Sequence, residues 1–254
     1  MKVVLCIPTL TRPYKACLDS IRASIPLLEA AGWEHGMVVE IGCPYISAAR
    51  TTLLRKALDA RADVIVFIDH DISWKPSDLL KLIETKGDVI AGLYRIKEVD
   101  GKYMGIIDDV DTRPVVREDG CIRATAVPAG FLKLTRRTVN EFMKAYPELI
   151  FGERCTPFID LFNHGAYKGA WWGEDYAFSR NWIAMGEEIW IVPDLDLTHH
   201  SADGSSYSGN YHEFMLRQPG GSKETQPMTI ALPGMSAFKL LFTNQGDFNH
   251  GPNK

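Results

Sequence analysis

The chain has 254 residues, of which 46% are hydrophobic and 24% are charged, a balance typical of a globular protein with room for a sizeable core. The formal net charge of −4 argues weakly against a nucleic-acid partner, because only a local basic patch could then bind one. Five cysteines without Cys-x-x-Cys spacing favour free thiols in a reducing compartment over a zinc site. The N-terminal apolar run is too short for a signal peptide, and no segment reaches the length of a membrane span, so we expect a cytoplasmic protein.

The first 93 residues predict strands alternating with helices. Pro8 is expected to end the first strand, Pro26 to interrupt the first helix and Ser47 to cap the second. This order predicts a doubly wound, mostly parallel sheet of the α/β class. Strands are expected at 3–7, 37–41, 64–68 and 88–93, and helices at 13–31, 47–58 and 77–85.

The second half is more varied. Residues 103–134 are rich in strand signals, with a hairpin turn at Asp119-Gly120. From about Ser201 onward, glycine, serine, proline and asparagine predict long loops and a tail. Helices are expected at 135–146, capped by Thr135, and at 174–185, and a strand at 188–192.

Asp69-His70-Asp71 is the most informative motif. It directly follows the continuous apolar run 64–68, which is typical of a strand buried on both faces. Ligands of open α/β sheets bind at the carboxyl ends of such strands. Two carboxylates there can converge on a divalent cation, which in turn can hold the diphosphate of a nucleotide.

Pro8 and Thr9 end the first strand at the same edge of the sheet, where backbone and hydroxyl can hold a base or ribose. Arg50 lies in the first turn of a predicted helix near that edge, and arginine can bind phosphate bidentately. Each feature alone is more often structural than functional.

Two further segments carry chemistry. Trp171 and Trp172 precede Glu174 and Asp175 at a helix N-terminus; indole faces stack on sugars, and an acid beside them is placed to act as a general base. A segment after the last strand, 193–200, ends in His199-His200, and a neutral imidazole there can complete a metal shell.

Together these segments resemble the GT-A glycosyltransferases, specifically family-2-like bacterial, phage and viral members. Residues 67–80 look like that group's metal motif and following helix, 88–94 like its next strand, and 173–180 like its Glu-Asp catalytic motif. The spacing of 193–199 matches the Pro-then-His segment before its metal histidine, and 207–209 matches a downstream Tyr-x-Gly. Thr51, Ser179 and Ser201 depart from the group's usual Asn, Cys and Gly, and the last departure leaves His200 open as the ligand.

The resemblance implies a GT-A domain over 1–212, with a nucleotide-sugar half at 1–100, an acceptor half at 101–212 and a loop-rich extension at 213–254. It also implies transfer of a hexose-like sugar from a nucleotide diphosphate sugar, such as a UDP-sugar, to a hydroxyl of a glycan or other acceptor. Mn²⁺ or Mg²⁺ would be the cofactor, and configuration would invert. The implied metal ligands are Asp69, Asp71 and His199. The implied catalytic carboxylates are Asp175, as the general base, and Glu174. The residues implied to contact the nucleotide-sugar donor are Pro8, Thr9, Arg12, Arg50, Asp69, Gly130, Trp171 and Trp172.

Three alternatives stay open at this point. A retaining transferase of the same fold would need no base at Asp175. A nucleotidyltransferase would be expected to carry a glycine-rich phosphate loop after the first strand, but residues 9–13 contain no glycine. A non-catalytic sugar-binding module would explain the tryptophans but not two separate sets of acids.

Overall fold

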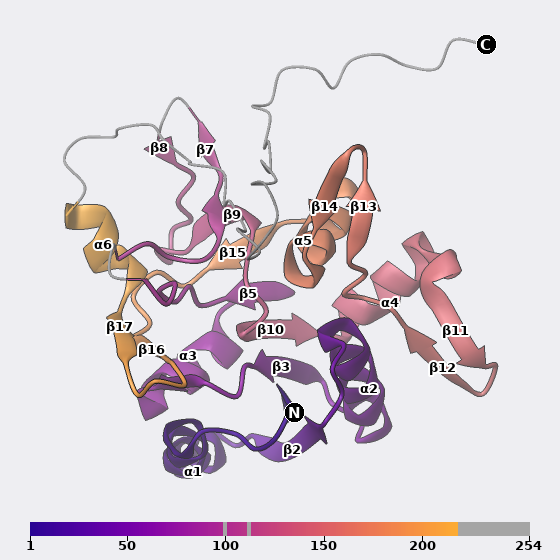
Figure 1. The fold of residues 1–254 in the computed structure, drawn as a ribbon, viewed down its shortest axis with the longest axis horizontal. Coiled ribbons are helices and arrows are strands. Elements are labelled where there is room, and N and C mark those ends of the chain that lie inside the picture. Colours follow the sequence, from indigo (N-terminus) through magenta and orange to yellow (C-terminus); the bar gives the residue numbers. More distant parts are fainter. Residues whose placement is uncertain (99–100, 111–112, 218–254) are drawn as a thin grey trace.

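The computed structural model describes residues 1–98, 101–110 and 113–217, which form a mixed α/β fold around an eight-stranded sheet (Figure 1). The strand order is β2-β1-β3-β10-β5-β15-β9-β6. Of these strands, β10 and β9 run opposite to the others, so the expected mostly parallel sheet is confirmed. The bounds are β1 (Lys2–Thr9), β2 (Glu34–Ile41), β3 (Val64–Ile68), β5 (Val89–Ala91), β6 (Ile106–Ile107), β9 (Ile122–Ala126), β10 (Phe131–Thr135) and β15 (Ile189–Ile191).

Helices cover both faces of the sheet, which is why its strands are apolar on both sides. In β1, Val4 and Cys6 pack into the core that contains α2, α4 and α5, whereas Leu5 and Ile7 pack into the core beneath α1 and α3. The helices are α1 (Lys15–Ala30), α2 (Ile46–Asp59), α3 (Pro76–Glu84), α4 (Arg136–Ala145), α5 (Glu174–Ala184) and α6 (Tyr211–Arg217).

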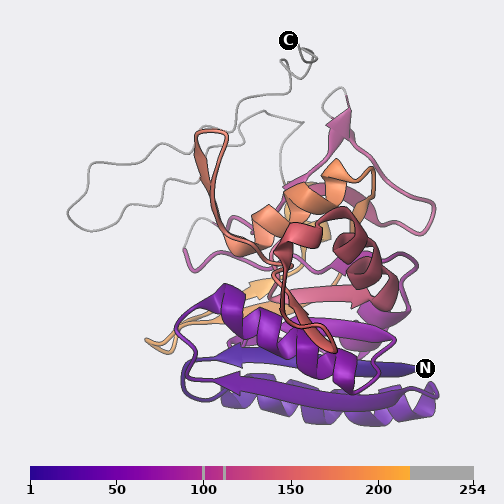
Figure 2. The ribbon, with the colours of Figure 1, turned by 90° about the vertical axis from the view of Figure 1, so that its right-hand side faces the viewer.

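Smaller sheets surround this core. A three-stranded antiparallel sheet joins β17 (Ser206–Gly209), β16 (Leu197–His200) and β4 (Ile72–Trp74), and thereby brings the segment after β15 beside the segment after β3. The β13–β14 hairpin projects from the body of the domain (Figure 2). The remaining elements are β7 (Asp109–Val110), β8 (Arg113–Pro114), β11 (Ile150–Glu153), β12 (Thr156–Ile159), β13 (Gly165–Tyr167), β14 (Ala170–Trp172) and a 3₁₀ turn at Pro147–Leu149.

Most boundaries lie within about three residues of the expected ones, but three expected breaks and caps differ. Strand β1 continues through Pro8 to Thr9, because its pairing with β3 ends at Cys6 and the missing amide hydrogen of Pro8 removes no bond on that side. Tyr45 occupies the N-cap position of α2 without a capping hydrogen bond from its side chain, so Ser47 lies inside the helix, where it is buried. Helix α1 continues through Pro26.

The expectation of long loops from Ser201 is wrong for residues 206–217. Strand β17 pairs with β16, and α6 packs the rings of Tyr211 and Phe214 against Tyr103, with centroids 5.5 and 5.1 Å apart. A short amphipathic segment within polar sequence therefore folds because the domain offers it an apolar surface. Helix α6 crosses the expected domain boundary at 212, and residues 218–254 of the expected extension lie outside the described residues.

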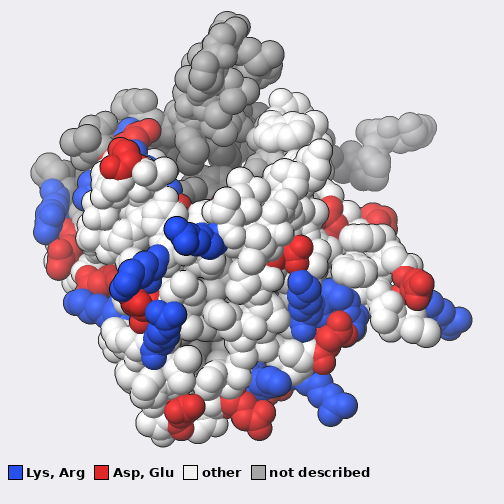
Figure 3. All heavy atoms as spheres, turned by 60° about the horizontal axis from the view of Figure 1, so that its bottom comes forward, with Lys and Arg blue, Asp and Glu red and all other residues white. Residues whose placement is uncertain are grey.

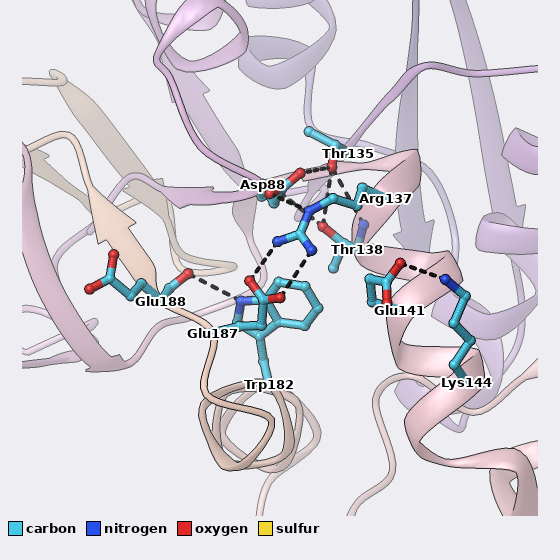
Figure 4. A network of polar contacts seen from close by, with 9 residues as sticks. All are labelled: Asp88, Thr135, Arg137, Thr138, Glu141, Lys144, Trp182, Glu187 and Glu188. Atoms are coloured by element: carbon cyan, nitrogen blue, oxygen red, sulfur yellow. Dashed lines mark hydrogen bonds and ion pairs between the residues drawn. The ribbon is translucent and has the colours of Figure 1, made fainter.

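Helix α4 is fixed to the sheet by a polar network (Figure 4). The expected cap is confirmed: the Thr135 hydroxyl accepts a hydrogen bond from the Thr138 amide. Arg137 pairs with Asp88, which precedes β5, at 2.8 Å, and with Glu187, which precedes β15, at 2.5 Å. The guanidinium of Arg137 thus connects α4 to the segments that precede β5 and β15.

Acidic and basic side chains lie side by side on the face of the molecule in Figure 3, as expected for a chain whose charges nearly balance. In the part of the chain that the structure describes, no helix is both long and apolar enough to cross a membrane.

Candidate active site

A cleft of about 460 Å³ opens where the carboxyl ends of the central strands meet the N-terminus of α5. It collects residues from β1, from the segments after β3 and β5, and from β14, α5 and β16. Nine of the twelve site residues named from the sequence line it, Arg50 among them. The lining residues are Pro8, Ile46, Arg50, Asp69, His70, Asp71, Tyr94, Met104, Trp171, Trp172, Gly173, Glu174, Asp175, Tyr176 and His199.

Asp69 is held on both carboxylate oxygens. Arg50 donates to Oδ1 at 2.8 Å, and the Tyr94 hydroxyl donates to Oδ2 at 3.2 Å. The Asp69 amide donates to the carbonyl oxygen of Gly130 at 2.9 Å. A Cβ atom on Gly130 would lie 2.3 Å from the Tyr94 oxygen and 2.5 Å from Asp69 Oδ2, so glycine is required for the backbone to approach this closely.

Arg50 is buried, with 2% of its surface exposed. Besides Asp69, it donates to the Ala129 carbonyl, and its Nε lies 3.5 Å from Glu174 Oε1. Burial alone would lower the pKa of Arg50, but the carboxylates of Asp69 and Glu174 outweigh that effect and raise it. The guanidinium therefore joins the segment after β3 to the start of α5.

Asp71 faces His199, because β16 pairs with β4, the strand that directly follows Asp71. Its Oδ2 lies 3.4 Å from His199 Nε2 and 2.5 Å from the ammonium nitrogen of Lys97. Burial raises the pKa of Asp71, but hydrogen bonds and charge from His199 and Lys97 hold it well below its usual value. The other imidazole nitrogen of His199, Nδ1, lies 2.8 Å from the Arg95 carbonyl oxygen and must donate to it.

His200 points the other way. Its Nε2 lies 2.8 Å from the Ser73 hydroxyl, and its ring stacks on Tyr14 with centroids 6.2 Å apart. Burial lowers the pKa of His200. Strand β16 therefore directs only one of its two histidines toward the acids.

Asp175 lies in the first turn of α5, at the wall of the cleft. Burial, with the negative charge of Glu174 beside it, raises its pKa to about 7, although its Oδ1 accepts a hydrogen bond from the Tyr176 amide at 2.8 Å. A carboxyl group with this pKa is matched to proton transfer near neutral pH.

The two tryptophans sit in different settings on β14. Trp171 is 60% exposed and lies beside His164, with ring centroids 5.9 Å apart. Trp172 is half-buried, and the Arg180 guanidinium lies 4.8 Å from its ring centroid and 4.1 Å from that of Tyr167. The projecting hairpin thus carries an exposed aromatic face at the mouth of the cleft.

Three sequence candidates do not line the cleft: Thr9, Arg12 and Gly130. The Thr9 hydroxyl is buried without a hydrogen-bond partner in the described part of the protein, and Arg12 is exposed. Sequence reasoning missed Tyr94, Lys97 and the Arg95 carbonyl. Tyr94 ends a segment that the sequence did single out, but Lys97 follows it with no motif of its own.

The side chains that could ligate a metal in this cleft fit a divalent cation in part. Asp71 and His199 offer a carboxylate and an imidazole whose other nitrogen is held by a carbonyl, the usual support of a metal-binding histidine. Within 1–98, 101–110 and 113–217, no group of three or more His, Cys, Asp or Glu side chains is arranged to hold a metal by itself. Mg²⁺ commonly takes one or two carboxylates together with substrate phosphates and water, so two protein ligands suit a cation shared with a diphosphate.

No protein-family model matches the chain, and no curated protein matches its sequence. Solved structures do match. A197 from STIV aligns with a TM-score of 0.50 and 15% identity over 83% of this chain and 95% of that one. A mutant Drosophila β-1,4-galactosyltransferase 7 in complex with manganese, UDP-Gal and xylobiose aligns at 0.43 and 12%, over 89% and 77%. TarS 1–349 from S. aureus aligns at 0.39 and 15%, over 76% and 58%.

At these identities the comparisons speak to the fold. The mixed α/β sheet with its small antiparallel additions is GT-A-like, as the sequence predicted.

Proposed function

We propose that the protein is a metal-dependent glycosyltransferase that moves a sugar from a nucleotide diphosphate sugar to an acceptor hydroxyl. The observation that carries this proposal is the convergence, in one cleft, of the Asp71–His199 pair and Asp175 with its raised pKa. In this proposal, Asp71 and His199 hold a cation that stabilises the leaving diphosphate. The carboxyl group of Asp175, with its pKa of about 7, accepts the proton of the attacking hydroxyl.

Asp71 and His199 are the proposed protein ligands of Mn²⁺ or Mg²⁺. A bound cation would supply positive charge to the departing diphosphate. Asp69 has both oxygens engaged by Arg50 and Tyr94, which favours a role in positioning the donor over a direct metal bond. Arg50 is assigned here to holding Asp69 and Glu174 in place, because its guanidinium is buried between them.

In the proposed reaction, the acceptor hydroxyl gives its proton to Asp175 and its oxygen attacks the anomeric carbon. The bond from that carbon to the diphosphate oxygen breaks, and the nucleoside diphosphate leaves with the electron pair. Attack opposite the leaving group inverts the configuration. Trp171 and Trp172 offer ring faces for the sugars, and Pro8, which lines the cleft, is a proposed donor contact.

The test is a panel of nucleotide sugars incubated with the protein and Mn²⁺, with release of free nucleoside diphosphate as the readout. A UDP-sugar is the expected donor. A nucleotidyltransferase would instead release pyrophosphate from a nucleoside triphosphate and a sugar 1-phosphate, supplied as a separate assay, and a sugar-binding module would bind the nucleotide sugar without turnover. Once an acceptor is found, the anomeric configuration of the product can be determined. Retention of the donor's configuration would indicate a retaining transferase, in which Asp175 is not the general base.

A further inference from the structure

Lys97 occupies the position from which a cation neutralises Asp71. Its ammonium nitrogen lies 2.5 Å from Asp71 Oδ2, and the two side chains are 33% and 12% exposed. The same oxygen faces His199 Nε2 at 3.4 Å. One carboxylate oxygen therefore has two partners, one of them a full positive charge.

The segment around Lys97 also orients the histidine. A carbonyl oxygen only accepts hydrogen bonds, so the Arg95 carbonyl fixes the proton of His199 on Nδ1 and directs Nε2 toward Asp71. Residues 95–97 thus supply both the group that aims the imidazole and the charge that balances the carboxylate.

A divalent cation held by Asp71 and His199 would bring a second positive charge beside Asp71 Oδ2, the oxygen that Lys97 already contacts. The Lys97 ammonium lies only 2.5 Å from the same oxygen, and two cations in such proximity repel strongly. The ion pair and a bound cation therefore compete for Asp71, and we expect the divalent cation to displace the Lys97 ammonium.

We propose that Lys97 is an exchangeable counter-ion. It neutralises Asp71 in the metal-free protein, is displaced when a divalent cation binds, and then pairs with the diphosphate of a nucleotide held by that cation. This inference rests on the metal site of the proposed function. It adds a donor-binding residue that the sequence analysis did not name.

The first test is an electron paramagnetic resonance titration with Mn²⁺ alone. Lys97→Met keeps the length of the side chain but removes the charge, and we expect it to bind Mn²⁺ about two- to fivefold tighter than wild type, the range for a partly exposed ion pair. Lys81→Met is the matched control, because Lys81 makes a 2.5 Å ion pair with Asp194 away from this cleft; its Mn²⁺ affinity should equal that of wild type. Unchanged or weaker binding in Lys97→Met would overturn the displacement.

The second test measures UDP binding at saturating Mn²⁺ by calorimetry. Lys97→Met should bind UDP about two- to fivefold more weakly, because the diphosphate loses one cation; equal or tighter binding would overturn the second half of the proposal. If neither wild type nor Lys97→Met binds Mn²⁺, the metal site of the proposed function fails. If both bind Mn²⁺ equally, that site stands and only the role of Lys97 fails.

Discussion

Asp71 Oδ2 and His199 Nε2 lie 3.4 Å apart, although one follows β3 and the other belongs to β16. Antiparallel pairing of β16 with β4 creates this contact, since β4 begins directly after Asp71 and His199 pairs with Ile72. The two residues that we assign to the metal are therefore held by backbone hydrogen bonds before any ligand arrives.

The alternation of β16 predicts that the two histidines differ. His199→Ala should weaken Mn²⁺ binding in the presence of UDP by about tenfold or more, because a ligand is lost. His200→Ala should leave it within about twofold, because that ring faces Ser73 and Tyr14. Titration of both variants by electron paramagnetic resonance checks this. Loss of Mn²⁺ binding in His200→Ala alone would reverse the assignment.

Asp175→Asn should reduce the rate of transfer by roughly 10²-fold or more, since the amide cannot accept the proton. UDP affinity should change little. In the wild-type enzyme the rate should rise with pH through about 7, as the carboxyl group loses its proton. A variant with normal rate and lost donor binding would instead make Asp175 a donor contact.

The same substitution should stabilise the fold above neutral pH. A folded-state pKa near 7, above the value of an unfolded aspartate, means that the charged carboxylate costs free energy in the folded protein, a cost that grows as pH rises from about 4 to 7. At pH 8 we expect Asp175→Asn to raise Tm by about 2 °C or more, with a smaller gain at pH 5. Thermal unfolding at the two pH values measures the difference, and equal Tm values for the variant and wild type at pH 8 would count against a buried, costly carboxylate.

Gly130→Ala should displace two residues that line the cleft, although Gly130 itself does not line it. The added methyl would collide with the Tyr94 hydroxyl and Asp69 Oδ2, so we expect a loss of about 1–3 kcal/mol in the free energy of unfolding. Donor binding should weaken as Asp69 moves. Gly36→Ala is the control, because its methyl would meet only Val4 at an ordinary 3.7 Å. Urea unfolding and UDP titration of both variants provide the measurement, and matching results for the two would rule out the close packing at Gly130.

Local sequence signals predicted the parts of the site that local structure determines. Asp69 and Asp71 follow a strand whose buried, β-branched character is visible in the sequence, and the alternation that separates His199 from His200 follows from strand geometry alone. The Thr135 cap of α4 has the same local origin.

The remaining features depend on tertiary packing. The direction of β10, inserted between β3 and β5, is not encoded in its apolar run, because either direction buries the same side chains. Arg50 has the pattern of a surface helix residue, but the start of α5 and the Phe162 ring cover it. Lys97 reaches Asp71 only through the course of the chain after β5, and no spacing rule connects the two.

The central claim is that Asp71 and His199 hold a cation that enables sugar transfer. Its most direct test is donor turnover with the nucleotide-sugar panel, measured as released nucleoside diphosphate, in Mn²⁺ and again in excess EDTA. The account predicts release in Mn²⁺, none in EDTA, recovery when Mn²⁺ is restored, and no release from Asp71→Ala under any of these conditions. Undiminished turnover in EDTA, or full activity of Asp71→Ala, would contradict it.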